Sequence, residues 1–245
     1  MAEVLSVIPA RFGSTRFPGK VLAKLGGKPI IQHVWERAIQ SKSDEVVIAV
    51  DNPEVFEAVR AFGGNAVMTS PDHPTGSDRI WEVACKKNAE IIINIQGDEP
   101  FVKPSVIDEL IDSLQKDSVP DMATVVVPCP RAEFESNPNM VKVVLSADSY
   151  ALYFSRSMIP FLRVGGKEME TYRHWGIYGY RRSSLERFVS LPEGKLEQCE
   201  KLEQLRALEN GMRIKVIVTP YSSIGIDTVE DLAAAEQFLA EQQSR

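Results

Sequence analysis

The sequence predicts an α/β fold built on a doubly wound, mostly parallel β-sheet. Over about the first hundred residues, short apolar runs alternate with segments whose apolar residues recur at helical spacing. The run Ile-Ile-Ile-Asn-Ile at 91–95 is typical of a strand buried on both faces, as strands of parallel sheets are. Because the segments alternate and their connections are short, right-handed crossovers between parallel strands are expected.

The expected elements of this first part follow one another in a regular order. Pro29 is expected to start the first helix, and Asp51 or Asn52 to cap a second helix that begins at Pro53. The glycine pair at 63–64 ends that helix. The remaining expected strands are 4–9, 45–50, 66–69, 91–95 and 123–127, and the other expected helices are 30–39, 77–88 and 104–116.

The alternation changes after residue 128, and residues 129–190 are expected to form an inserted, mixed α/β lobe. Neither an internal repeat nor a low-complexity linker separates the parts, so residues 1–245 are interpreted as a single domain with this insertion. Thr228 and Asp231 have the spacing of a capping box that opens the last helix. The other expected elements are an antiparallel hairpin of Val141–Leu145 and Tyr150–Phe154, the strands Gly176–Tyr180 and Ile214–Val218, and a helix Glu200–Asn210 stopped by Gly211.

Composition limits the classes of function. With 44% hydrophobic and 25% charged residues the chain is ordinary globular protein, and its net charge of −6 argues against a broad nucleic-acid surface. No signal peptide and no run of about 18 apolar residues is found, so a cytoplasmic protein without a membrane partner is expected. The three cysteines and three histidines are scattered, which indicates neither a disulfide framework nor a zinc site.

A basic loop follows the first expected strand directly. Arg11, Arg16 and Lys20 stand among two glycines and the pair Ser14-Thr15. Glycines let backbone N–H groups approach anionic oxygens, hydroxyls add donors, and the cations neutralise phosphate charge. The loop matches neither the Walker A pattern nor the dinucleotide-binding glycine pattern. A polyphosphate site is predicted, and a solvated basic loop is the alternative.

Two carboxylates are expected near this loop. Asp98 follows the strand 91–95, and Asp227 precedes the last helix. Carboxylates beside a polyphosphate indicate Mg²⁺, a hard cation that binds oxygen ligands. An Asx-type turn is the alternative for Asp98, and a helix N-cap is the favoured alternative for Asp227 on the residues alone.

Several further polar residues have both a functional and a structural interpretation. The segment 75–79 could hold a base or ribose, or could simply be a capped helix start. Arg156 and Arg163 could hold a carboxylate by paired hydrogen bonds. His174 and Tyr178 lie four apart and share one face of an extended strand, where packing is the common role. On the residues alone, Glu203 and Gln204 would be interpreted as an exposed polar pair.

The motifs together resemble those of the CMP-Kdo synthetases, the 3-deoxy-manno-octulosonate cytidylyltransferases of the sugar nucleotidyltransferase superfamily. The opening loop is similar to the family pattern Pro-Ala-Arg-x-x-Ser-Thr-Arg-x-Pro-Gly-Lys. The resemblance extends over nearly the whole chain and implies a Rossmann-like nucleotidyltransferase fold. The segments that carry it are 9–20, 73–79, 94–100, 137–144, 150–156, 173–180, 202–206 and 225–231.

The resemblance also implies roles for individual residues. It implies nucleotide binding by Ala10, Arg11, Ser14, Thr15, Arg16, Lys20, Thr75, Ser77, Arg79 and Gln96. It implies catalytic roles for Arg11, Arg16, Lys20 and Asp98, and Mg²⁺ coordination by Asp98 and Asp227. It implies a sugar site of Gln96, Arg156, Arg163, His174, Tyr178, Glu203 and Gln204.

The implied reaction joins CTP to a free 2-keto-3-deoxy sugar acid, giving a CMP-sugar and pyrophosphate for lipopolysaccharide biosynthesis. The lobe is where this family dimerises, so a homodimer is expected. A CMP-sialic acid-type synthetase and a non-catalytic nucleotide sensor are the alternatives. The sequence leaves open whether the sugar is Kdo or its 8-amino analogue.

Overall fold

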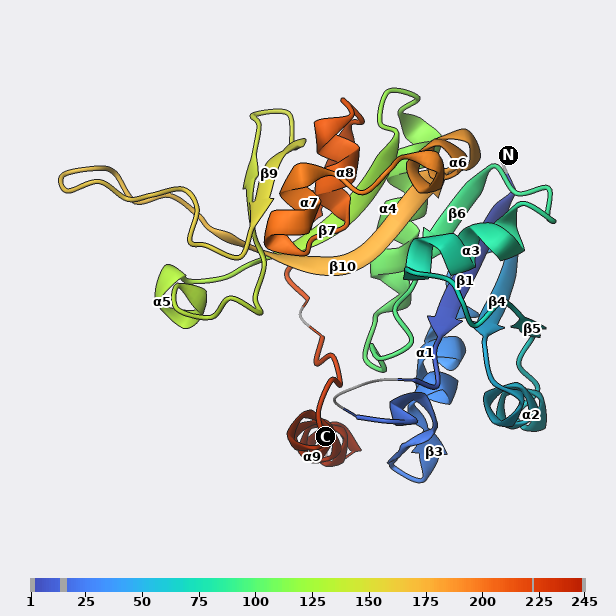
Figure 1. The fold of residues 1–245 in the computed structure, drawn as a ribbon. Coiled ribbons are helices and arrows are strands. Elements are labelled where there is room, and N and C mark those ends of the chain that lie inside the picture. Colours follow the sequence, from blue (N-terminus) through green and yellow to red (C-terminus); the bar gives the residue numbers. More distant parts are fainter. Residues whose placement is uncertain (1–2, 14–16, 222, 244–245) are drawn as a thin grey trace. The chain divides into compact units, whose positions relative to one another are not determined.

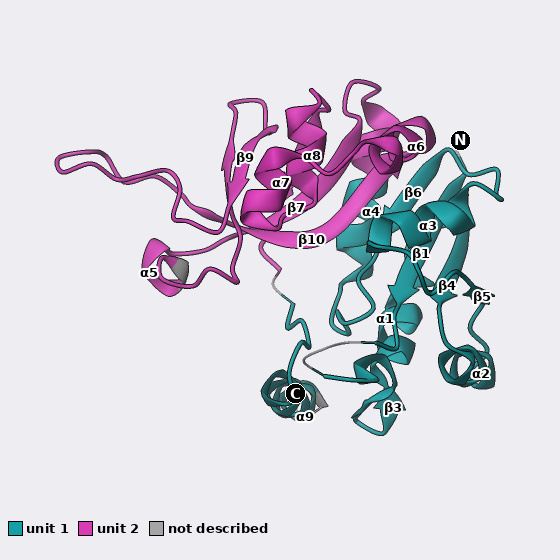
Figure 2. Cartoon of the chain, in the orientation of Figure 1, with its two compact units in different colours: residues 1–111, 223–245 teal, residues 112–222 magenta. Residues whose placement is uncertain are grey.

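The chain divides into two compact units. The computed structural model describes residues 3–13, 17–221 and 223–243. Unit 1 comprises residues 1–111 and 223–245, and unit 2 comprises residues 112–222 (Figure 2). The range expected for an inserted lobe, 129–190, falls within unit 2. Its status as an insertion in a single domain stays a prediction.

Unit 1 contains a parallel sheet in which the strand order reverses. Its strands are β1 (Val4–Ala10), β4 (Glu45–Val50), β5 (Ala66–Met68) and β6 (Ile91–Asn94). They are ordered β6-β1-β4-β5, and every pair is parallel. Consecutive residues of β1 and β6 are buried although their side chains point to opposite faces, so both faces of the sheet are covered. The predicted doubly wound parallel sheet is thereby confirmed.

The helices of unit 1 start where their capping residues predict. Asn52 caps α2 by accepting the Glu54 N–H, and Thr75 and Asp78 form a reciprocal capping box on α3. α3 ends at Ala84, earlier than the predicted 88. The helical elements are α1 (Ile30–Ala38), α2 (Pro53–Ala61), α3 (Gly76–Ala84), α4 (Pro104–Lys116, ending in unit 2), α9 (Val229–Gln243) and the 3₁₀ turn η1 (Lys20–Leu22), and a small hairpin joins β2 (Lys24–Leu25) to β3 (Lys28–Pro29).

Unit 2 contains a mixed sheet in the order β11-β7-β10-β8-β9. Its strands are β7 (Met122–Pro128), β8 (Lys142–Leu145), β9 (Ala151–Ser155), β10 (Tyr172–Arg181) and β11 (Ile214–Val218), and its helices are α5 (Arg131–Phe134), α6 (Arg182–Ser190), α7 (Lys195–Glu200) and α8 (Gln204–Glu209). β8 and β9 form the predicted antiparallel hairpin. The segment between β9 and β10 extends away from the rest of unit 2, as the yellow and orange loop in Figure 1 shows.

The single helix predicted over 200–210 is wrong. Lys201 adopts a left-handed conformation with φ 52°, which ends α7 and separates it from α8. The corner between α7 and α8 is stabilised by Arg206. Its guanidinium donates two hydrogen bonds of 2.7 Å to the carboxylate of Glu197. Both side chains are less than one-tenth exposed.

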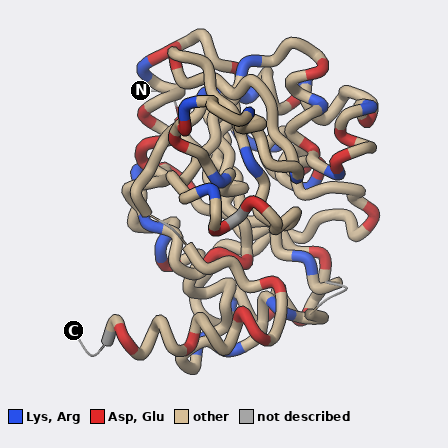
Figure 3. Tube along the Cα trace, turned by 90° about the vertical axis from the view of Figure 1, so that its left-hand side faces the viewer, with Lys and Arg blue, Asp and Glu red and all other residues tan. Residues whose placement is uncertain are grey.

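Charges of both signs are spread along most of the chain. Basic and acidic residues are interspersed along the trace of the described residues in Figure 3, without a long basic stretch, whereas the charged residues of α9 are all acidic. Among the described helices, none combines the length and the apolar composition that crossing a bilayer requires.

Removing the cation from the α7–α8 corner should destabilise the protein strongly. In Arg206→Met, Glu197 stays buried without its counter-charge, and the free energy of unfolding should fall by about 3–5 kcal/mol. Urea denaturation measures this. Lys116→Met is the control, because it breaks a pair with Asp112 whose lysine is 77% exposed and should cost less than about 1 kcal/mol. Equal effects of both variants would contradict the structural role of Arg206.

Candidate active site at the carboxyl edge of the parallel sheet

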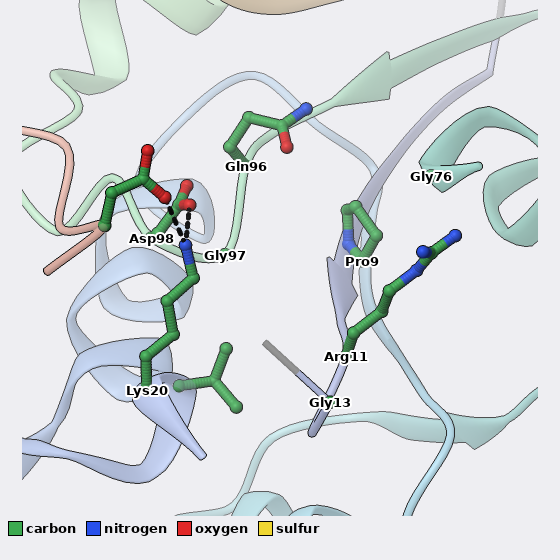
Figure 4. A pocket seen from close by; sticks show the side chains of 10 residues that line it. Pro9, Arg11, Gly13, Lys20, Gly76, Gln96, Gly97 and Asp98 are labelled. Carbon is green, nitrogen blue, oxygen red and sulfur yellow. Dashed lines mark hydrogen bonds and ion pairs between the residues drawn. The ribbon is translucent and has the colours of Figure 1, made fainter. Parts of the chain in front are cut away.

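One pocket of unit 1 lies where its strand order reverses. β4 and β5 follow β1 on one side, whereas β6 lies on the other, and such a switch point leaves a crevice beyond the carboxyl ends of the strands. A cavity of about 440 Å³ opens there. Pro9 near the end of β1, with Arg11 and Gly13 after it, forms one side, and Gln96, Gly97 and Asp98 after β6 form the other (Figure 4).

One lysine joins two carboxylates in this cavity. The Nζ of Lys20 lies 2.5 Å from Oδ2 of Asp98 and 2.8 Å from Oδ1 of Asp227 (Figure 4). Burial alone would lower the pKa of Lys20, but the two carboxylates outweigh this effect and raise the pKa above its usual value. The lysine is therefore a fixed positive charge, and the carboxylates converge on a single cation.

Hydrophobic packing of the neighbouring residue places Asp227 beside Lys20 and Asp98. The preceding Ile226 is fully buried in a cluster with Leu25, Ile30 and Phe101, and its N–H donates to the carbonyl of Asp98 over 2.9 Å. Thr228, not Asp227, caps α9, through a reciprocal pair of bonds with Asp231. The favoured N-cap interpretation of Asp227 is therefore wrong. The predicted capping box is confirmed.

The basic loop is only partly within the described residues. Ser14, Thr15 and Arg16, predicted to bind phosphate, lie outside them. Arg11 lines the cavity opposite Lys20 (Figure 4), and its guanidinium donates to the carbonyl of His73 over 2.8 Å. Arg11 and Lys20 thus place cations on two sides of the cavity.

The segment expected to hold the base or ribose is a capped helix start. Thr75 caps α3, and Ser77 is buried. Arg79 has an exposed fraction of 0%, and its guanidinium donates to Asp51 over 3.1 Å and to Thr69 over 2.5 Å. Its side chain therefore presents no surface to a ligand, because these buried partners hold it inside the protein. The side chain of the predicted nucleotide residue Ala10 is likewise buried, whereas Gln96 lines the cavity.

In unit 2, a bulge in β10 brings together two predicted sugar residues. The pairing of β10 with β7 skips Gly176 and Ile177, so that the rings of His174 and Tyr178 lie 5.4 Å apart, centre to centre. Thr124 lies 3.0 Å from Nε2 of His174 and donates to the carbonyl of Ile177 over 2.9 Å. The sequence could not show this bulge, and it makes the two rings direct neighbours.

The polar groups of this cluster are uncharged at neutral pH. Burial lowers the pKa of His174 to about 3. Burial, together with the nearby Tyr180 and Glu203, raises the pKa of Tyr178. Gln204 is buried as well, and its Nε2 has no hydrogen-bond partner among the described residues. A buried donor of this kind fits a ligand that brings its own oxygen.

In the described part of the chain, neither of the two arginines predicted to hold a carboxylate lies in a ligand pocket with the other predicted sugar residues. Arg156 donates to three backbone carbonyls, those of Pro138, Glu200 and Lys201, at 2.6–3.2 Å. Its guanidinium fastens loops of unit 2. Arg163 is exposed on the segment between β9 and β10. The structure does not bring Arg156 and Arg163 together with His174 in one pocket of the described residues, and their ligand roles stay predictions.

Asp51 and Gly97 are site residues that sequence analysis missed. Asp51 was considered only as a helix cap, yet its Oδ1 accepts the N–H of Phe12 in the basic loop over 3.0 Å. Gly97 approaches β1 so closely that a Cβ would lie 2.8 Å from the carbonyl oxygen of Pro9. The available signals were a carboxylate directly after β4 and a glycine three residues after the end of β6.

Comparison with known proteins identifies the family. The cytidylyltransferase family model matches residues 5–214. The 3-deoxy-manno-octulosonate cytidylyltransferase of Thermodesulfovibrio yellowstonii is 51% identical, with 96% of this chain and 97% of the relative covered. That of Geobacter sulfurreducens is 48% identical, with 94% and 96% covered. The chain belongs to the 3-deoxy-manno-octulosonate cytidylyltransferase family.

A solved structure agrees with this family membership. CMP:2-keto-3-deoxy-manno-octonic acid synthetase complexed with CTP superposes with a TM-score of 0.94 at 43% identity, covering 98% of this chain and 100% of that chain. The resemblance inferred from the motifs is thereby confirmed, as is the nucleotidyltransferase class. A cytidylyltransferase from Leptospira borgpetersenii, with a TM-score of 0.65 and 20% identity, shares the fold.

Adding a methyl group at Gly97 should disturb the edge of the cavity. The Cβ of Gly97→Ala would press on a backbone carbonyl that cannot rotate away, so the free energy of unfolding should fall by about 1–3 kcal/mol. Gly76→Ala is the matched control on the facing segment, where a Cβ would lie 3.9 Å from Pro9. Thermal denaturation of both variants compares them. A neutral Gly97→Ala would show that the close approach is not required.

Proposed function

We propose that this chain transfers the cytidylyl group of CTP to the anomeric hydroxyl of free Kdo, releasing pyrophosphate. The observation that supports this most is the switch-point cavity in which Lys20, Asp98 and Asp227 converge. Phosphoryl-type transfer asks a protein chiefly for positioning and charge neutralisation, and these residues can supply both. The family membership supplies the identity of both substrates.

Two described cations would act on the triphosphate. Lys20 and Arg11 stand on two sides of the cavity, where they can hold phosphate oxygens and stabilise the charge that develops on departing pyrophosphate. The predicted contribution of Arg16 stays part of the proposal. Pro9 and Gly97, with the closely packed edges of β1 and β6, keep the cavity walls rigid.

Asp98 and Asp227 would hold Mg²⁺. Their fit rests on their donor chemistry, because both carboxylates already share one cation at 2.5 and 2.8 Å. Among the described residues there is no cluster of three or more ligating side chains, so substrate oxygens would complete the coordination. When bound, the metal would lower the pKa of the attacking hydroxyl and neutralise charge on the α-phosphate.

The neutral polar cluster of unit 2 is proposed to bind the sugar. His174, Tyr178 and Gln204 offer hydrogen bonds without net charge, which suits the hydroxyl groups of a sugar. Glu203 adjoins Tyr178 and would add an acceptor. Arg156 reaches three carbonyls already, so it would support this cluster indirectly.

A homodimer, a cytoplasmic location and a role in lipopolysaccharide biosynthesis complete the proposal. They rest on the family resemblance. Exposed apolar side chains on the segment between β9 and β10 support self-association: Phe161 is 85% exposed, Met169 56% and Val164 fully.

A pyrophosphate-release assay tests the substrates. CTP with Kdo should release pyrophosphate, whereas ATP or GTP should react poorly because a pocket that pairs with a pyrimidine edge excludes a purine by size. Sialic acid in place of Kdo should give little product. Preference for sialic acid would favour the related synthetase, and CTP binding without pyrophosphate release would favour a nucleotide sensor. Kdo and its 8-amino analogue should be compared in competition.

The metal proposal makes a separate prediction. Asp98→Asn should reduce turnover at least about a hundredfold, because the lost charge acts mainly in the transition state. In ligand-free protein, Mg²⁺ should raise the melting temperature of the wild type and not of Asp98→Asn. Lys20→Met should show a larger Mg²⁺ effect, since the ammonium no longer competes for the carboxylates. An unchanged Mg²⁺ effect in Asp98→Asn would place the metal elsewhere.

A further inference from the structure

The backbone of Phe12 forms hydrogen bonds to Gly19 and Asp51, which hold the start of the basic loop. Its carbonyl accepts the N–H of Gly19 over 3.0 Å, and its ring lies 3.4 Å from the place of a Cβ on Gly19. Gly19 has φ +67° and directly precedes Lys20 at the start of η1. The position of Phe12 therefore determines where the backbone of Lys20 begins.

Phe12 is held in turn by Asp51. The N–H of Phe12 donates to Oδ1 of Asp51 over 3.0 Å. Asp51 follows β4, the strand that pairs with β1 up to Ala10. The bond thus extends the contact between these two segments beyond the sheet and into the loop.

The other oxygen of Asp51 is held by a buried cation. Nη2 of Arg79 lies 3.1 Å from Oδ2 of Asp51, and Nη1 donates to Thr69 over 2.5 Å. Thr69 itself donates to the carbonyl of Val50 over 2.9 Å, next to Asp51. Arg79, with an exposed fraction of 0%, is thereby fixed on the ends of β4 and β5. Asp51 cannot turn without breaking these contacts.

Packing alone does not require this arrangement. A buried ion pair can be replaced by apolar side chains of similar size with little loss of stability, so its presence is weak evidence for a stabilising role. An apolar residue at 51 could not accept the N–H of Phe12. The carboxylate is the part of the arrangement that reaches the loop.

We propose that Asp51, oriented by Arg79, is a positioning residue for nucleotide binding, which fixes Phe12 and through it Gly19 and Lys20. This inference rests on the proposed function for the identity of the ligand, CTP. Residues that are held in place before the nucleotide arrives, here Phe12, Gly19 and Lys20, lose less conformational freedom on binding. Arg79 then acts on the nucleotide through Asp51 and not by direct contact.

Asp51→Ala tests the proposal against a matched control. Asp44 precedes β4 and accepts the N–H of Val4 over 2.8 Å, so it ties the same two segments at the opposite edge of the sheet. We expect Asp51→Ala to raise the KM and the dissociation constant of CTP about ten- to a hundredfold, as for loss of a hydrogen bond to a charged group. The KM of Kdo should change less than about twofold, and Asp44→Ala should leave both substrates as in the wild type.

Two more variants separate positioning from folding. Asp51→Asn has one oxygen for the two donors that the carboxylate serves, the N–H of Phe12 and the guanidinium of Arg79, so its CTP affinity should be at least that of Asp51→Ala although its melting temperature falls. The double variant Asp51→Leu/Arg79→Met removes the ion pair without burying a lone charge, should fold, and should bind CTP as weakly as Asp51→Ala.

The outcomes distinguish this inference from the proposed function. Wild-type CTP affinity in Asp51→Ala or in the double variant overturns the positioning role, as does an equal rise in the KM of Kdo. Failure of the wild type to bind CTP in calorimetry refutes the proposed function instead.

Discussion

The attraction between one ammonium and two carboxylates organises the candidate active site. Lys20 stands 78 residues before Asp98 and 207 residues before Asp227, so this interaction joins three distant segments at the carboxyl edge of the parallel sheet. Among the described residues, the charges of Lys20 and Arg11 balance those of Asp98 and Asp227. A divalent cation between the carboxylates would add positive charge beside a polyphosphate. The carboxylates that order the ligand-free cavity are therefore the same residues that are proposed to hold a metal.

Unit 1 uses ion pairs in two environments. Arg79 is completely buried and its partner Asp51 is 12% exposed, whereas the side chain of Lys20 is 14% exposed and its partner Asp227 is about half exposed. The pair of Arg79 is costly to open, because a completely buried guanidinium would lose its partner in a medium of low polarity. A partly solvated pair can exchange one cation for another at smaller cost. Burial therefore separates a fixed ion pair, that of Arg79, from a more exposed one, that of Lys20, which the proposed function places against the substrate.

Local patterns predicted the parts of the fold that depend on local physics. Apolar runs gave the strands of unit 1, and capping residues such as Asn52 and Thr228 gave the starts of helices. The helix break at Lys201 escaped prediction because the left-handed conformation is imposed on a residue without a turn preference. The hydrogen bonds that Arg79 and Arg156 make inside the protein were not predicted, for another reason. An arginine that binds a ligand and one that binds backbone carbonyls have the same side chain, and only tertiary placement distinguishes them.

The proposed sugar site illustrates how far chemistry can be inferred when tertiary placement is known. The bulge in β10 turns two residues of an ordinary strand into adjoining rings, and burial keeps His174 and Tyr178 uncharged at neutral pH. Such a cluster can order hydroxyl groups without attracting phosphate, which would favour the sugar over a second nucleotide. Arg156 donates three of its five N–H groups to backbone carbonyls, so a role of Arg156 or Arg163 toward the sugar carboxylate stays a prediction. Neutral hydrogen bonding is the chemistry that His174 and Tyr178 would offer to the hydroxyl groups of a sugar.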